Sequence, residues 1–162
     1  MSSALNPCHP KAIGETVEAV AVQEVENLTF VPDREAQWHD AVVEGVLCPR
    51  VADIGFVGIP LLESGTAVEI KGAQLTSGAA RGRWFIRQRQ HERLVEERGA
   101  YLLCVHDRRG EELLAMAVIL ASTLEGLLPD GWTSVDGDRS EQGYRQLAWS
   151  RVFDPEDVEG RR

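Results

Sequence analysis

Three residues near the middle of the chain have side chains that could hold a divalent cation and activate water: Asp53, Glu69 and Lys71. Glu69 and Lys71 are two positions apart in a stretch typical of a β-strand, so their side chains should emerge on the same face. Carboxylate oxygens suit Mg²⁺ or Mn²⁺. A lysine ammonium beside them can orient water and stabilise developing negative charge. The pattern predicts a metal site centred on the strand segment Val68–Lys71, with Asp53 as the partner carboxylate.

The Glu-x-Lys triplet is a weak signal by itself. With 26 acidic residues among 162 and only two lysines, chance would place an acid two positions before a lysine in roughly a third of chains of this composition. The signal gains strength because the chain has fifteen arginines, yet one of its two lysines lies inside an apolar strand. A charge there is costly unless it is paired. The alternative interpretation is a structural Glu–Lys pair at a sheet edge.

The surrounding sequence predicts the elements that would position these side chains. Apolar residues spaced i, i+4 and i+8 predict a helix over Asp33–Leu47. This spacing is shared by Trp38, Val42 and Val46. The segment Val51–Leu62 is expected to be extended and to form a hairpin with the strand Thr66–Lys71. Such a hairpin would carry Asp53 on one arm and Glu69 on the other.

The rest of the chain divides into recognisable segments. A glycine-bearing loop over Gly72–Gly82 should lead into a helix over Arg83–Arg98, and buried strands should follow at Tyr101–Val105 and Leu113–Leu120. We expect a loosely ordered N-terminal segment (1–31) with a short strand around Val20–Val25, a core (32–128) and an acidic C-terminal extension (129–162). The order of elements predicts an α/β fold with a mixed central sheet flanked by helices.

The net charge of −9 alone argues against a nucleic-acid partner, since neutralising phosphates normally requires a basic face. The distribution of charge weakens this objection. Residues 79–98 hold six arginines and three glutamates, a local excess of +3, so the remainder carries −12. This acidic, lysine-poor composition resembles that of proteins from salt-loving archaea or their viruses, in which acidity reflects solvation at high salt.

The sequence also indicates in which cellular compartment the protein is expected. No stretch approaches the roughly 20 apolar residues that a membrane-spanning helix needs, and the first residues lack the pattern of a secretory signal. The three cysteines are odd in number and widely spaced, which fits neither a disulfide framework nor a paired zinc site. We therefore expect a cytoplasmic protein with no membrane partner.

The candidate residues resemble the signature of the restriction-endonuclease-like, or PD-(D/E)xK, nucleases: an aspartate, a spacer, and Glu-x-Lys on the next strand. In this chain the pattern is Asp53, fifteen residues, and then Glu69 to Lys71. The layout, over about Pro32 to Leu120, looks most similar to small archaeal Holliday-junction resolvases and related viral or repair nucleases. Ala52 stands where the family usually has a proline, and the overall acidity is atypical of junction resolvases.

The resemblance implies a restriction-endonuclease-like core, Mg²⁺ (or Mn²⁺) as cofactor, DNA as partner and a homodimer. It also implies a role in DNA recombination or repair. Family members often add a glutamate from the first helix to the metal site, and Glu35 is the candidate because it would lie about 60° from Trp38 on the helical wheel. An acid that favours the first turn of a helix is the alternative reading of Glu35.

The family also commonly has a polar residue on the helix that follows Glu-x-Lys. Gln90 would occupy that position and help to place the water or a ligand carboxylate. Arg81, Arg83 and Arg87 would approach the phosphates, the alternative being a solvated helix face. His91 is expected to be packed in the core.

These observations predict a metal-dependent DNA endonuclease that hydrolyses phosphodiester bonds, including those of branched DNA or junctions. A first alternative is a catalytically inactive protein of the same fold that binds nucleic acid or a protein partner. A second is an interaction protein of a virus or mobile element, suggested by the acidic C-terminal segment and predicting no metal binding.

Overall fold

The computed structural model describes residues 10–160, apart from positions 33, 36–37, 50–54, 59–61, 78–79 and 135–142. Its helices and strands are, in chain order, α1 (Pro10–Glu24), β1 (Val25–Phe30), β2 (Ala41–Pro49), β3 (Gly55–Gly58), β4 (Ala67–Gln74), β5 (Thr76–Ser77), β6 (Ala80–Arg81), β7 (Arg83–Arg87), α2 (Gln88–Glu96), β8 (Ala100–His106), β9 (Leu113–Leu120), α3 (Ala121–Glu125), β10 (Tyr144–Ala148), the 3₁₀ helix η1 (Trp149–Arg151) and α4 (Pro155–Glu159). None of the described helices is both long and apolar enough to cross a membrane.

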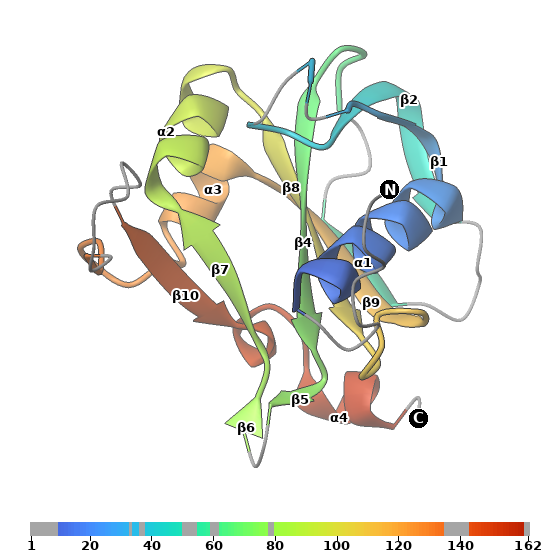
Figure 1. Ribbon diagram of the computed structural model, residues 1–162, viewed down its shortest axis with the longest axis vertical. Helices are drawn as coiled ribbons and strands as arrows, with labels where there is room; N and C mark the ends of the chain where they lie inside the picture. Colours follow the sequence, from blue (N-terminus) through green and yellow to red (C-terminus); the bar gives the residue numbers. More distant parts are fainter. Residues whose placement is uncertain are drawn as a thin grey trace, which may run out of the picture.

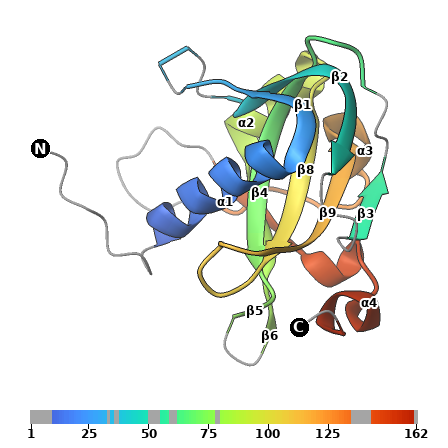
Figure 2. The ribbon, with the colours of Figure 1, turned by 90° about the vertical axis from the view of Figure 1, so that its right-hand side faces the viewer.

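A six-stranded mixed sheet forms the centre of the molecule, with strand order β1-β2-β4-β8-β9-β3 (Figures 1 and 2). β4 pairs in parallel with β8, and β3 with β9, whereas the other neighbouring strands are antiparallel. Helix α1 packs on one face of the sheet. α2, α3 and the antiparallel ribbon of β7 and β10 cover the other face. The predicted α/β class, a mixed sheet flanked by helices, is confirmed.

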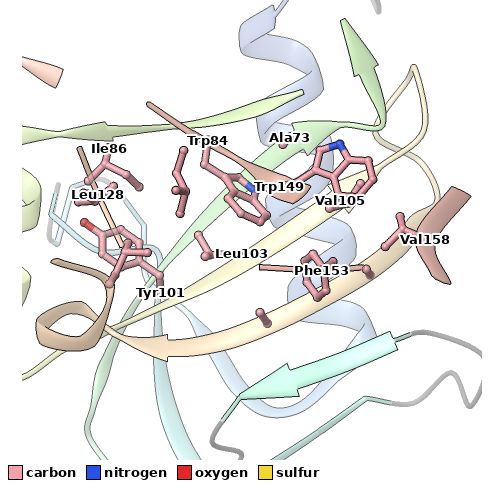
Figure 3. Packing of buried hydrophobic residues seen from close by; sticks show 14 of the residues in the cluster. Ala73, Trp84, Ile86, Tyr101, Leu103, Val105, Leu128, Trp149, Phe153 and Val158 are labelled. Carbon is pink, nitrogen blue, oxygen red and sulfur yellow. The ribbon is translucent and has the colours of Figure 1, made fainter. Parts of the chain in front are cut away.

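The alternation of side chains along β4 assigns its residues to these two layers. Val68 and Ile70 pack in the cluster beneath α1. The register of β4 against β8 places Glu69 beside Tyr101 and Lys71 beside Leu103. Tyr101 and Leu103 belong to the opposite cluster, together with the tryptophans and Phe153 shown in Figure 3. Glu69 and Lys71 therefore emerge on the face that α2 and β7 cover.

The N-terminal part differs from the expectation. Residues 10–30, expected to be loosely ordered with a strand around Val20–Val25, form α1 and β1. Ile13, Val17 and Ala21 recur at i, i+4 and i+8 and are buried against the sheet. Because the third of these positions is only an alanine, the apolar stripe is thin, and the helical pattern was correspondingly weak.

The helix predicted over Asp33–Leu47 is wrong. This region contains β2, which pairs with β1 and β4. Ala41, Val43 and Leu47 are buried and alternate with more exposed positions, as a strand requires. An i, i+4, i+8 spacing is also an even spacing, so it fits one face of a strand as well as one face of a helix, and β-branched valines favour the strand.

The predicted hairpin is also wrong. β3 pairs with β9, so β8 and β9 lie between β3 and β4 in the sheet, and the antiparallel neighbour of β4 is β2. Asp53 lies outside the described residues, and its part in the site stays a prediction. The predicted helix over Arg83–Arg98 is correct only in its second half, because Arg83–Arg87 is β7 and α2 begins at Gln88.

The segment expected to be a C-terminal extension contributes directly to the core. It contains β10, which pairs with β7, followed by η1 and α4. Trp149, Phe153 and Val158 are buried in the cluster on the α2 side of the sheet (Figure 3). The indole Nε1 of Trp149 donates a hydrogen bond of 2.9 Å to the carbonyl oxygen of Leu75. This C-terminal segment thus packs on the α2 side of the sheet, which is the face from which Glu69 emerges.

Candidate active site

Glu69 and Lys71 form an ion pair on β4. Glu69 is only 4% exposed, and its Oε1 lies 3.7 Å from Nζ of Lys71, whose side chain is 16% exposed. Burial raises the pKa of Glu69 well above its usual range, and the charge of Lys71 acts in the opposite direction. The two predicted residues therefore meet, and the carboxylate is held where a positive charge would stabilise its ionised form.

Asp40 supplies a second carboxylate. It immediately precedes β2, whose first residue, Ala41, pairs with Val68. The backbone N–H of Ile70 donates a hydrogen bond of 2.8 Å to Oδ2 of Asp40. The Asp40 carboxyl also hydrogen-bonds to Glu69, and that bond together with its negative charge raises the pKa of Glu69 further. The pairing of β2 with β4 thus sets two carboxyl groups side by side.

Asp40 was missed by the sequence analysis because its segment was assigned to a helix. The signal was nevertheless present, since Asp40 stands directly before the run Ala41–Val43, whose β-branched valines are typical of a buried strand. An aspartate at the start of such a strand could reach the strand paired with it. Asp40 therefore lies beside Glu69, and the place of Asp53 at the same carboxylate stays a prediction.

Gln90 projects from the first turn of α2 to the same carboxylate. Its side-chain Nε2 donates a hydrogen bond to Oε2 of Glu69. Its Oε1 atom is buried and has no hydrogen-bond partner among the described residues. α2 is docked by its buried residues His91 and Leu94, and by the bond from the backbone N–H of Gln88 to the carbonyl of Gly143. The predicted proximity of Gln90 to the site is therefore present in the structure.

Next to Gln90, His91 anchors α2 to the layer behind the site. The ring is 2% exposed, with Nδ1 3.0 Å from the Tyr101 hydroxyl and Nε2 2.6 Å from Oε2 of Glu125. Glu125 also accepts a 2.8 Å hydrogen bond from Arg145. Burial lowers the pKa of His91, which favours a neutral ring that donates from Nε2 and accepts at Nδ1. His91 is thus packed, as expected, and braces the helix that carries Gln90.

The glutamate predicted from the first helix has a different position. Glu35 lies in an exposed turn, in which its N–H donates to the carbonyl of Pro32 at 2.9 Å. Its assignment to a helix is wrong because that helix does not exist. The first helix is α1, and it carries Glu18, whose negative charge also raises the pKa of Glu69. The negative charges that raise the pKa of Glu69 therefore come from Glu18 on α1 and from Asp40 just before β2.

The three predicted phosphate-binding arginines occupy two settings. Arg81 forms an ion pair with Glu159 at 2.8 Å, and its guanidinium lies 5.6 Å from the ring centroid of Trp149. Arg83 and Arg87 project from the exposed face of β7. The predicted helix over Arg83–Arg98 does not place them on one helix with Gln90, because the chain is extended until Arg87.

A profile of the PD-(D/E)XK nuclease superfamily domain matches residues 5–154. The chain belongs to this superfamily. The match includes α1 and most of the C-terminal segment, and therefore extends beyond the region from Pro32 to Leu120 on which the resemblance rested. No curated protein and no solved structure gives a significant match to the chain.

Membership of the PD-(D/E)XK nuclease superfamily confirms the predicted restriction-endonuclease-like fold, and it indicates phosphodiester hydrolysis as the general activity. Nucleases of this superfamily typically use a divalent metal ion, and nucleic acid is the substrate that the superfamily implies. Two properties of the site fit such an ion. Asp40 and Glu69 offer the carboxylate oxygens that Mg²⁺ and Mn²⁺ prefer, and the unpaired Oε1 of Gln90 is a further buried oxygen at the same place.

The site is nevertheless not a tight cluster of acids. Within the described ranges, no group of three or more His, Cys, Asp or Glu side chains is arranged to hold a metal ion. The described carboxyls that contact one another here are those of Asp40 and Glu69. The residues of this PD-(D/E)XK protein therefore fit a divalent cation held mainly by two carboxylates.

Proposed function

We propose that this protein is an endodeoxyribonuclease that depends on Mg²⁺ or Mn²⁺ and hydrolyses phosphodiester bonds with Asp40, Glu69 and Lys71. One observation carries the proposal: the buried Glu69 carboxylate contacts both the Asp40 carboxyl and the Lys71 ammonium. Glu69 is buried, and Asp40 and Lys71 beside it are half-buried. Gathering such groups away from water costs stability, which supports a site that serves a cation or a reaction. Membership of a nuclease superfamily supports the same activity.

In this proposal, Asp40 and Glu69 would hold the metal ion. When bound, such an ion polarises a phosphate oxygen and lowers the pKa of water. The Lys71 ammonium, 3.7 Å from Glu69, orients the attacking water and stabilises the negative charge that develops on the phosphate. Gln90 holds the Glu69 carboxylate in one orientation through its Nε2 hydrogen bond.

The direct test is cleavage by the purified protein with Mg²⁺ or Mn²⁺, using linear, nicked, flapped and branched DNA over a range of salt concentrations. Lys71→Ala should lower the rate by about 10²-fold or more while leaving DNA affinity largely unchanged. Lys11→Ala, which changes the other lysine of the chain, is the matched control and should retain activity.

Two outcomes would count against this function. Absence of cleavage on every substrate would contradict it, as would equal rates for the parent and Lys71→Ala. Binding of DNA without turnover in the parent protein would favour the alternative of an inactive protein of the nuclease fold.

We extend the proposal to action on branched DNA by a cytoplasmic homodimer, in recombination or repair. The resemblance of Glu69 and Lys71 to the motif of junction resolvases is the support for this extension. A preference for four-way junctions over linear duplex in the cleavage assay, with sedimentation at twice the chain mass, is the expected result.

A further inference from the structure

The outer face of β7 is unusual in its composition. Side chains along β7 alternate between buried and exposed, and the inward residues Trp84 and Ile86 belong to the core. The outward residues are Arg83, Phe85 and Arg87. Phe85 is 52% exposed, and the formation of a strand does not require an aromatic ring on the side that faces solvent. An exposed ring between two arginines suggests a surface with a binding role.

β10 completes this face. In the antiparallel register, Tyr144 lies opposite Arg87 and Gln146 lies opposite Phe85, so they share the outward side of the ribbon. The rings of Phe85 and Tyr144 are 5.5 Å apart between centroids and inclined by 37°. The ribbon therefore presents two neighbouring aromatic rings, two guanidinium groups and one amide. We call these five residues the ribbon face.

A cavity connects the ribbon face to the strand that carries the site. It has a volume of about 600 Å³ and is lined by Arg83, Phe85 and Gln146 from the ribbon, and by Gly72 and other residues of β4. Gly72 directly follows Lys71. Figure 1 shows β7 running beside the lower part of β4, and the two strands are in contact. The volume lies within the range that small-molecule groups such as nucleotides occupy in proteins.

The chemistry of the ribbon face matches that of an unpaired nucleic-acid strand. Aromatic side chains stack on exposed bases, and arginines next to them pair with the phosphates and stack on base faces. Arg83 has no ion-pair partner among the described residues, so its charge is available to an anion. The chain as a whole carries −9, so a local positive face is the place at which a polyanion can approach. Bases within a blunt duplex are stacked on one another and cannot reach the rings.

We propose that the ribbon face binds an unpaired DNA strand, with bases stacked on Phe85 and Tyr144 and phosphates against Arg83 and Arg87. The strand would pass through the cavity toward Lys71. This inference rests on the proposed nuclease function and specifies its substrate as DNA with a single-stranded segment.

Binding of a fluorescent oligodeoxythymidine, measured by anisotropy in EDTA, tests the proposal without cleavage. Phe85→Leu should weaken binding about tenfold, because one stacking platform is lost. The matched control is Phe30→Leu, which changes a phenylalanine of similar exposure (50%) on β1. A blunt duplex should bind the parent and Phe85→Leu with similar affinity. Equal effects of the two leucine variants would overturn the proposal, as would an equal loss for the duplex.

A second variant keeps the test independent of any disturbance near Phe85. For the single strand, the logarithm of the association constant falls linearly with the logarithm of the salt concentration. Arg83→Ala should make this slope shallower by about 0.7, the amount expected for one lost phosphate contact. Arg109→Ala removes an exposed arginine from the β8–β9 turn and should leave that slope unchanged. Identical slopes for the two variants would overturn the proposal, as would tighter binding of oligouridine than of oligodeoxythymidine, which would assign the ribbon face to RNA.

The two proposals can fail separately. If the parent protein cuts DNA but Phe85→Leu binds oligodeoxythymidine normally, only the ribbon face is rejected. If oligodeoxythymidine binding depends on Phe85 but no DNA is cut with Mg²⁺ or Mn²⁺, the nuclease function is rejected and the ribbon face stands as a binding surface.

Discussion

The side-chain amide of Gln90 donates a hydrogen bond to the carboxylate of Glu69, and so joins the first turn of α2 to β4. This contact links two separate parts of the site. Glu69 is placed by the sheet, whereas Gln90 is placed by the packing of His91 and Leu94 beneath α2. The orientation of the carboxylate therefore depends on the helix as well as on the strand.

The first prediction concerns this contact. Gln90→Ala should lower kcat by about 10 to 100-fold, the usual effect of removing a residue that orients a metal-binding side chain, and should leave KM for DNA nearly unchanged. Gln88→Ala is the matched control, because Gln88 also donates to a glutamate, Glu92, at 3.0 Å but on the exposed surface. Steady-state cleavage kinetics of both variants provide the measurement. Equal kcat values would show that Gln90 has a structural role only.

The second prediction concerns the paired carboxyls. In EDTA, Asp40→Asn should raise the melting temperature by about 2–4 °C, if removing a like charge beside Glu69 is worth about 1 kcal/mol in a chain of this size. The asparagine oxygen can still accept the hydrogen bond from the Ile70 N–H. In the parent, millimolar Mn²⁺ should raise the melting temperature through binding to the folded state, and Asp40→Asn should lose most of that gain.

Asp53→Asn, measured in parallel, tests the prediction made from the sequence. A normal Mn²⁺ response and normal cleavage in this variant would contradict a role for Asp53 at the metal. A normal Mn²⁺ response in Asp40→Asn would contradict the assignment of Asp40.

The sequence was most informative where a single local pattern determines the outcome. Glu69 and Lys71 share a strand face because side chains alternate with period two, and the buried strands β8 and β9 stand out as continuous apolar runs. The fold class followed from the order of such elements. The place of Gln90 near the carboxylate was expected only from the resemblance to the PD-(D/E)xK nucleases, which commonly have a polar residue on the helix after Glu-x-Lys.

The partner of Glu69 could not be inferred in the same way. Which strand lies beside β4 depends on long-range pairing, and β2 and β3 both carry an aspartate just before them, Asp40 and Asp53. Choosing Asp53 required a hairpin, which the turn residues Glu63–Gly65 between the two extended segments favour. The actual neighbour, β2, had been assigned to a helix because Val42 and Val46 fit both periodicities. A local pattern that is ambiguous between helix and strand is settled by tertiary packing.

The third prediction concerns the C-terminal segment. Trp149 is fully buried, and its indole N–H is bonded to the Leu75 carbonyl. Trp149→Ala should therefore lower the free energy of unfolding by roughly 3–5 kcal/mol, measured by urea denaturation. Trp149→Phe, which keeps a ring but loses the N–H donor, should cost less. An unchanged stability in the alanine variant would show that residues 129–162 behave as a separable extension.

The fourth prediction concerns pH. Burial holds the pKa of His91 below its ordinary value of about 6.5, although Glu125 favours the charged ring and Arg145 opposes it. The unfolded chain therefore binds more protons than the folded protein once the pH falls below about 6.5. The stability associated with His91 is fully present above that pH and decreases as the pH falls toward the folded-state pKa. His106, whose pKa is also lowered by burial, contributes in the same direction.

His91→Gln should consequently reduce the slope of unfolding free energy against pH between about pH 6.5 and 5, without abolishing it, because His106 remains. The glutamine amide can still donate to Glu125 and accept from the Tyr101 hydroxyl, so the loss of stability at pH 8 should be smaller than that of His91→Ala. Urea denaturation of the three proteins at a series of pH values gives these slopes. A slope in His91→Gln equal to that of the parent would mean that the ring is not held neutral by its burial, and the account of how α2 is anchored behind Glu69 would then be incorrect.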